Sequence, residues 1–168
     1  SLPVEGSQTY EQVTRVFYRG LAALEVGLLD QAKQEFTQTT RLAPSEPAGW
    51  ANLGIAHLRL GELDAAAEPI TQAVSLAPRN ADVVLLAGRM EIARGRIDEG
   101  VAQLRHAVDL NPNALRARYA LAQEVERSGA PDAEAETQRL LDDLLMRAPD
   151  NLAVLLDQVR KRLTLDEL

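Results

Sequence analysis

The sequence has no cysteine, only two histidines and few aromatic residues, which make up 4% of its 168 positions. Without cysteine the chain forms neither a disulfide nor a thiolate metal site, and its redox compartment stays open. The histidines are expected apart, His57 on a packed helix face and His106 toward solvent. A catalytic site needs its groups within mutual reach. We therefore predict no enzyme activity, no catalytic residue, no metal and no cofactor.

Long apolar runs and an excess of basic residues are also missing. No stretch approaches the roughly 20 apolar residues that span a bilayer, so no membrane insertion is expected. Acidic residues outnumber basic ones by 25 to 18, and the net charge is −7. Nucleic-acid binding depends on Lys and Arg that neutralise phosphates, so no nucleic-acid partner is expected. The chain begins at Ser1 rather than Met, as processed forms and pieces of longer proteins do. Cytoplasmic and periplasmic locations are both compatible with the sequence.

The chain does have a strict internal period. Its hydrophobic content of 46% is mostly Ala and Leu, which favours packed helices over a sheet. Glycine recurs every 34 residues, aspartate follows three residues after each glycine, and proline shares the interval. The members are Gly27, Gly61, Gly95 and Gly129, then Asp30, Asp64, Asp98 and Asp132, then Pro44, Pro78 and Pro112. A regular period of roughly 20–50 residues indicates one helical or mixed unit copied in a row and stacked on its neighbours.

Each unit follows the same plan. The phased glycine is expected to end a first helix in the left-handed conformation. The phased aspartate is expected to cap the second helix through its side chain, and the phased proline to end that helix. Short turns make the two helices antiparallel. At the start of the chain, Thr9 and Gln12 form a capping-box pattern that is expected to open the first helix.

Two places depart from the plan. Pro149 comes three residues late, so three residues enter after Asp132 and predict a second helix over about 132–147 that is a turn longer than its counterparts. Pro69 falls inside a predicted helix, where a bend or local widening is expected. Beyond these units, residues 152–168 carry an apolar stripe and a polar back, as a terminal capping helix does. The alternative is the first helix of a truncated fifth unit.

Small residues share one phase inside the first helices, at Gly20, Gly54, Gly88 and Ala122. Glycine within a helix costs up to about 1 kcal/mol, so its repeated use implies that a neighbouring helix approaches closely there. Large residues are expected to fill the remaining space, namely Phe36, Trp50, Ile70 and Leu104.

These residues give the chain a family resemblance. The second unit fits best, with Trp50, Leu53, Gly54, Gly61, Ala66, Ala73 and Pro78 in place, and the match covers about 13–151. The chain thus resembles tetratricopeptide repeat (TPR) proteins. The resemblance implies an all-α, right-handed α-solenoid of about four helix-turn-helix repeats plus a C-terminal capping helix. The expected segments are 1–12 (tail and helix start), the repeats 13–46, 47–80, 81–114 and 115–151, and the cap 152–168.

The resemblance also implies a function. In the family, partners commonly lie along a concave groove lined by the first helices, so we expect a protein-interaction scaffold that binds a protein or peptide partner. The candidate groove residues carried over are Phe17, Tyr18, Leu21, Asn52, Ile55, Arg59, Arg89, Arg116, Tyr119 and Gln123. The same helix face is expected to include Thr14, Ala48, Ala51, Asp82, Leu85, Leu86 and Arg127. Members that clamp a chaperone's C-terminal carboxylates use asparagines where this chain has Leu21 and Ile55. Only Asn52 survives, so that clamp is not expected.

Other readings stay open. The arginines Arg89 and Arg116 are equally well explained as solubilising residues of a helix face. The repeats could be an accessory, regulatory or oligomerisation domain of a multidomain enzyme. Leucines of the last segment could make a homo-oligomer. An RNA-binding helical repeat is opposed by the acidic composition and the 34-residue phase.

Overall fold

The computed structural model describes residues 7–151. Within that range the chain forms eight α-helices and no strand, which confirms the all-α prediction. The helices are α1 (Gln8–Glu25), α2 (Leu29–Leu42), α3 (Pro47–Arg59), α4 (Leu63–Leu76), α5 (Ala81–Ala93), α6 (Ile97–Leu110), α7 (Leu115–Ser128) and α8 (Ala133–Arg147). The predicted cap over 152–168 lies outside the described residues. Among the helices that are described, none is long and apolar enough to cross a membrane.

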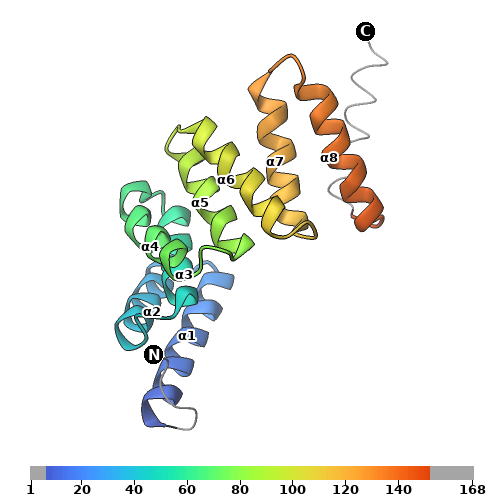
Figure 1. Cartoon of the computed structure of the whole chain (residues 1–168). Coiled ribbons are helices and arrows are strands. Elements are labelled where there is room, and N and C mark those ends of the chain that lie inside the picture. The colour runs from blue at the N-terminus through green and yellow to red at the C-terminus, as the bar shows by residue number, and fades with distance from the viewer. Residues whose placement is uncertain (1–6, 152–168) are drawn as a thin grey trace.

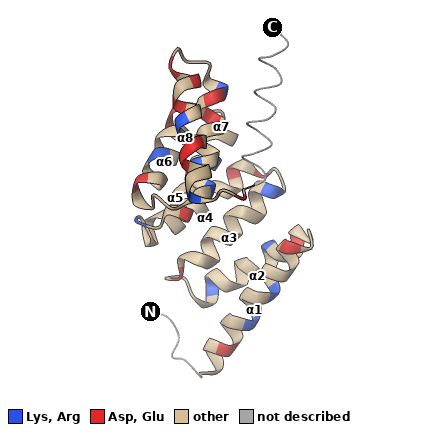
Figure 2. Ribbon diagram, turned by 90° about the vertical axis from the view of Figure 1, so that its right-hand side faces the viewer, with Lys and Arg blue, Asp and Glu red and all other residues tan. Residues whose placement is uncertain are grey.

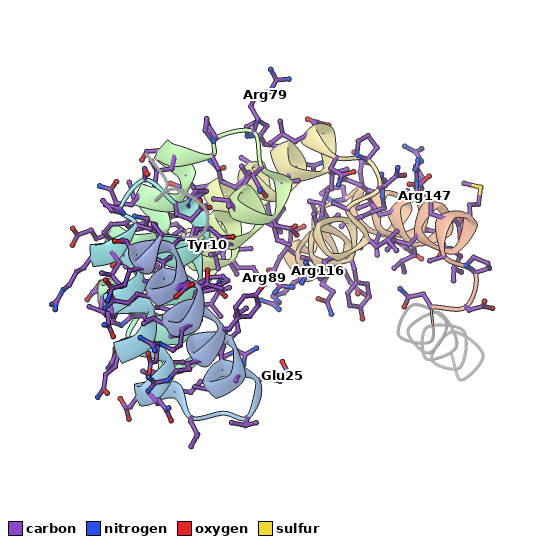
Figure 3. All side chains as sticks on the ribbon, turned by 90° about the horizontal axis from the view of Figure 1, so that it is seen from below. Tyr10, Glu25, Arg79, Arg89, Arg116 and Arg147 are labelled. Atoms are coloured by element: carbon purple, nitrogen blue, oxygen red, sulfur yellow. The ribbon has the colours of Figure 1, made fainter. Side chains whose placement is uncertain are left out.

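The helices form four hairpin pairs that stack in chain order (Figure 1). Each first helix packs chiefly on its own second helix and on the second helix of the preceding pair. The first helices of successive pairs also touch one another, α1 with α3, α3 with α5 and α5 with α7. Seen from below, the ribbon curves around an open inner side (Figure 3). The first helices therefore line the inside of a curved solenoid.

The turns between paired helices depend on the phased glycines. All four have left-handed backbones, with φ between +61° and +81°, as predicted. At Gly27 a side chain would meet no atom within 4 Å, so the residue is needed there for its backbone conformation and not for space.

The predicted N-caps of α1, α2, α4 and α6 are wrong by two residues. Asp132 is the N-cap of α8, as predicted, but its side chain makes no cap hydrogen bond. Asp30, Asp64 and Asp98 lie in the first turn of α2, α4 and α6. The N-cap of each helix is the residue two positions earlier, and no side chain makes a cap hydrogen bond there. Because the apolar residue before each aspartate is already helical, the carboxylate is too far along to cap. It still favours the positive end of the helix dipole. At α1 the cap is Ser7, whose Oγ accepts from the Tyr10 amide at 3.2 Å, so the capping box at Thr9 is not formed.

The insertion in the fourth unit does not lengthen α8 by a turn. α8 has 15 residues where α2, α4 and α6 have 14. The other two extra residues lie in the turn between Gly129, which keeps its phase, and the first residue of α8. The reason lies in the buried face of α8, Thr137, Leu141 and Leu144, which keeps the spacing of Ala32, Phe36 and Thr39 in α2. Since this face must meet α7 in the same register, the extra residues are spread around the turn.

The core repeats with the same period. Phe36, Ile70 and Leu104 are fully buried, each against the glycine of its own first helix. A Cβ at Gly54 would lie 2.4 Å from Ile70 Cγ1, which confirms the predicted close approach. Trp50 does not fill the core as expected. It is half-buried, and its Nε1 donates to the carbonyl of Pro44 at 2.8 Å, so it fastens the loop between two repeats.

Pro69 lies inside α4, at its seventh residue, and is buried. The helix is continuous from Leu63 to Leu76 across it. Pro69 thus does not break the helix, and the expected bend or local widening stays a prediction.

Candidate functional site

A groove of about 740 Å³ opens on the inner side of the solenoid. It is lined by α3, α5 and the first turn of α7, so three successive repeats contribute to it. Its apolar lining consists of Pro47, Ala48, Ala51, Ile55, Leu58, Val83, Leu85 and Leu86. Its polar lining consists of Glu46, Asn52, Arg59, Asn80, Asp82, Arg89 and Arg116.

The 34-residue period explains why these residues meet. Equivalent positions of successive first helices lie side by side along the inner face, because those helices touch. Asp82 and Arg116 are one period apart, and so are Ile55 and Arg89. The repeat position that holds Ile55 in α3 therefore holds Arg89 in α5, so the groove lining gains charge from one repeat to the next. The apolar end lies on α3, which contains no Asp or Glu (Figure 2).

The three arginines of the groove differ in their hydrogen-bond and ion-pair partners. Arg59 Nη1 donates to the carbonyl of Leu24 at 2.9 Å, so it ties the end of α3 to the end of α1. Arg116 Nη2 lies 3.1 Å from Asp82 Oδ1. Arg89 is exposed and has no hydrogen-bond or ion-pair partner within residues 7–151. Arg89 and Arg116 both point into the inner side of the curve (Figure 3).

Five of the ten residues expected from the sequence line this groove, namely Asn52, Ile55, Arg59, Arg89 and Arg116. The other five lie on the flanking helices α1 and α7. Phe17 is half-buried, with its ring 5.9 Å from those of both Tyr18 and Phe36, and Leu21 packs on the same cluster. Tyr18 is 64% exposed. On α7, Tyr119 packs against the cluster of Leu141 and Leu144, and Gln123 is exposed.

Sequence reasoning missed five lining residues, Glu46, Pro47, Leu58, Asn80 and Val83. Glu46 and Asn80 are the N-caps of α3 and α5, and Asn80 Oδ1 accepts from the amides of Asp82 and Val83. The groove therefore reaches the ends where both helices begin, and these ends carry partial positive charge. The signal for Asn80 was available, because asparagine directly before a helical pattern is a cap.

The groove carries three arginines against two carboxylates, although the whole chain has a net charge of −7. The lining of the groove thus has a small positive net charge, opposite in sign to that of the whole protein. Such a contrast raises the local concentration of anionic groups and steers them to the surface.

A second group of titratable residues lies where the first repeat packs against the second. Glu62 accepts from Lys33 Nζ at 2.9 Å, and its other oxygen lies 2.6 Å from His57 Nδ1. The Lys33 ammonium, with help from His57, lowers the pKa of Glu62, and the hydrogen bond to Glu62 raises the pKa of Lys33. These residues link α2 and α3 to the turn before α4. His106 is exposed, as expected.

Comparison with known proteins places the architecture in a family. The tetratricopeptide repeat family model matches residues 18–81 and again residues 85–150. No curated protein matches the sequence significantly. Among solved structures, a TPR protein of Thermus thermophilus has a TM-score of 0.79 and 22% identity, over 88% of this chain and 80% of that one.

Two other structures are similar at comparable identity. An O-GlcNAc transferase of Thermobaculum terrenum has a TM-score of 0.78 and 23% identity, over 84% of this chain but only 27% of the transferase chain. The first TPR of Spaghetti (RPAP3), bound to the HSP90 peptide SRMEEVD, has a TM-score of 0.66 and 19% identity, over 71% of this chain and 95% of that one. At these identities the likeness concerns the fold. The family match covers most of the chain, which therefore belongs to the tetratricopeptide repeat family.

Proposed function

We propose that the chain is a protein-interaction scaffold whose groove binds an extended or helical peptide segment of a partner protein. The observation that carries this proposal is the groove of about 740 Å³, in which an apolar lining adjoins Arg89, an arginine without a partner in the described part of the chain. Proteins of this fold generally mediate protein–protein interaction. Apolar side chains of the peptide would contact Ile55 and Leu86, and the exposed Tyr18 would extend the surface on α1.

The charges favour an acidic peptide. A guanidinium holds a carboxylate by two parallel hydrogen bonds, which are shorter and stronger than neutral ones. Arg89 needs no internal bond broken before it binds. A complex of this kind needs a free energy of only about −8 kcal/mol to be micromolar.

One similar structure supports the acidic preference without supplying the partner. The peptide SRMEEVD held by the first TPR of Spaghetti contains three acidic side chains. The present groove has Ile55 at a position where a carboxylate clamp is expected to have asparagine. We therefore propose a different acidic peptide, anchored by apolar side chains as well as by charge.

The test is a charge reversal with a matched control. Peptides selected from a random displayed library on the wild-type protein are measured by fluorescence anisotropy against Arg89→Glu with Arg116→Glu. We expect at least about tenfold weaker binding, because each bidentate pair becomes a repulsion. Arg79→Glu makes the same charge change at an exposed residue that points away from the inner side (Figure 3) and should leave affinity unchanged. Unchanged affinity of the double variant, with unchanged helicity by circular dichroism, contradicts the proposal.

A second candidate function has one observation in its favour. The similar transferase chain is more than three times longer than the matched region, so repeats of this kind occur within an enzyme. We propose as the alternative that the present repeats are an accessory or regulatory domain. The full-length reading frame decides between the two, since a catalytic domain in the same polypeptide would favour the alternative.

The repeat boundaries after residues 46, 80 and 114 form part of this proposal. Each directly precedes the first residue of α3, α5 or α7. The helices that line the groove then belong to repeats two, three and four.

A further inference from the structure

The groove contains a carboxylate of its own. Asp82 Oδ1 lies 3.1 Å from Arg116 Nη2, and both side chains line the groove. The two residues are one 34-residue period apart, so they come from adjacent repeats. Both are largely open to solvent, with side-chain exposures of 68% for Asp82 and 78% for Arg116. The pair is thus accessible from the groove and is not part of the core.

We propose that Asp82 is a specificity-determining residue that competes with the ligand: it holds Arg116 in the free protein, and an acidic ligand must displace it. This inference rests on the proposed function. It explains why two groove arginines behave differently. Arg89 has no partner in the described part of the chain and is ready to bind, whereas Arg116 becomes available only when a ligand carboxylate replaces that of Asp82. A peptide with two carboxylates then gains more than a peptide with one.

The exposure of the pair makes displacement easy. Exposed ion pairs contribute little, because solvent screens them and two flexible side chains must be ordered. Removing the Asp82 carboxylate should therefore tighten binding of an acidic peptide by about two- to fivefold. It also leaves three arginines against Glu46 alone in the groove, which acts in the same direction.

The substitution Asp82→Asn leaves the supporting structure in place. The start of α5 is fixed by Asn80, whose Oδ1 accepts from the backbone amides of Asp82 and Val83 at 3.0 and 3.3 Å. The side chain of Asp82 takes no part in that cap. A matched control exists in α4, where Asp64 also lies in the first turn and pairs with an arginine, Arg94, at 3.2 Å but does not line the groove.

The experiment uses two synthetic peptides, acetyl-Leu-Ala-Glu-Glu-Ala-Leu-amide and the same peptide with both glutamates replaced by glutamine. Affinities are measured by two-dimensional NMR titration of the whole chain, which also locates the site. We expect Asp82→Asn to bind the glutamate peptide about two- to fivefold more tightly and the glutamine peptide unchanged. Asp64→Asn should change neither. Adding Arg116→Gln to Asp82→Asn should remove the gain.

The outcomes separate the two proposals. If the glutamate peptide shifts groove resonances and Arg89→Glu abolishes the shifts, but Asp82→Asn leaves affinity equal or weaker, competition by Asp82 is overturned and the groove proposal stands. If the glutamate peptide shifts no groove resonance in either the wild type or Asp82→Asn, the acidic groove proposal fails and this inference fails with it.

Discussion

At the residue scale, Arg118 shows that two different residue types can make the same contact at one repeat position. It lies two periods after Trp50, and its Nη2 donates to the carbonyl of Pro112 at 2.8 Å as Trp50 Nε1 donates to that of Pro44. Its Nη1 also pairs with Asp143 of α8 at 2.7 Å, and the residue is 9% exposed. Sequence reasoning gave it no role, because arginine in a helix is usually exposed. The shared position indicates its role only once the bond made by Trp50 is known.

The close contact at Gly54 gives a prediction at this scale. A Cβ there would lie 2.4 Å from Ile70 Cγ1, which is fully buried and has nowhere to move. We expect Gly54→Ala to lower the free energy of unfolding by about 1–3 kcal/mol, the usual cost of overpacking. Urea unfolding followed by circular dichroism measures it.

Two controls identify the cause of that loss. In the Ile70→Ala background the clashing atom is gone, so adding Gly54→Ala should cost clearly less than it does alone. Gly27→Ala, where no atom lies within 4 Å, should lose only the about 1–2 kcal/mol of a left-handed backbone. An equal cost of Gly54→Ala in both backgrounds would show that the contact with Ile70 is not the reason.

At the scale of the helix, the sequence correctly predicted which helices exist and in which order they follow. It predicted their first and last residues less accurately. The phased glycines located each turn, because their positive φ is a requirement that few other residues meet. Asp30, Asp64 and Asp98 were misread as caps, because an acidic residue is favoured both at the cap and in the first turn, and composition does not separate the two. The insertion before α8 was misplaced, because only the packed face of Thr137, Leu141 and Leu144 fixes where extra residues are accommodated.

Pro69 gives a prediction at this scale. It lies inside α4 and lacks the amide that would bond to the carbonyl of Ala65. We expect Pro69→Ala to raise the free energy of unfolding by about 1–2 kcal/mol, which is less than the about 3 kcal/mol cost of an interior proline because contacts of the buried ring are lost. Urea unfolding measures the change. Gln103→Ala, one period later in α6, gains no amide and should change stability by less than about 0.5 kcal/mol. A destabilised Pro69→Ala would mean that packing of the ring outweighs the missing bond.

At the scale of the whole molecule, ion pairs join different elements of the fold. Lys33 of α2 bonds to Glu62 before α4, and Arg105 of α6 bonds to Glu136 of α8. Asp143 of α8 pairs with Arg118 of α7 and also accepts from Arg147 within α8. Lys33 lowers the pKa of Glu62, Arg105 that of Glu136, and Arg147, followed by Arg118, that of Asp143. Each carboxylate is therefore more stable in the folded chain than in the unfolded chain.

The direction of these shifts sets the pH dependence. A lowered pKa contributes stability above the pKa of the unfolded chain, about 4, and that contribution is lost as pH falls through the folded pKa. We expect the melting temperature to be level from pH 7 to about pH 5 and to fall steadily below about pH 4. Thermal melts at fixed ionic strength measure this. A variant with Glu62→Gln, Glu136→Gln and Asp143→Asn should melt lower at pH 7 and show a shallower acid decline, whereas parallel curves would contradict the assignment.

At this scale, the sequence predicted only part of the groove lining. The period and the family resemblance placed the ten candidates on first helices, and the groove gathers five of them. The other five lie outside its lining, because no single residue encodes how far each helical pair rotates against the next, and that rotation decides where the inner surface is deep. Their contact with a partner stays a prediction. Tyr119 shows the effect, since it packs toward α8 and not into the groove.

The bond between Asp82 and Arg116 has a mechanical consequence, because its two residues belong to adjacent repeats on the inner side of the curve (Figure 3). Straightening a curved stack moves groups on its inner side apart. Tension along the array would therefore part these two side chains before it unfolded a helix. Arg116 would then be released from Asp82, and the inner surface would bind anionic groups more tightly under tension than at rest.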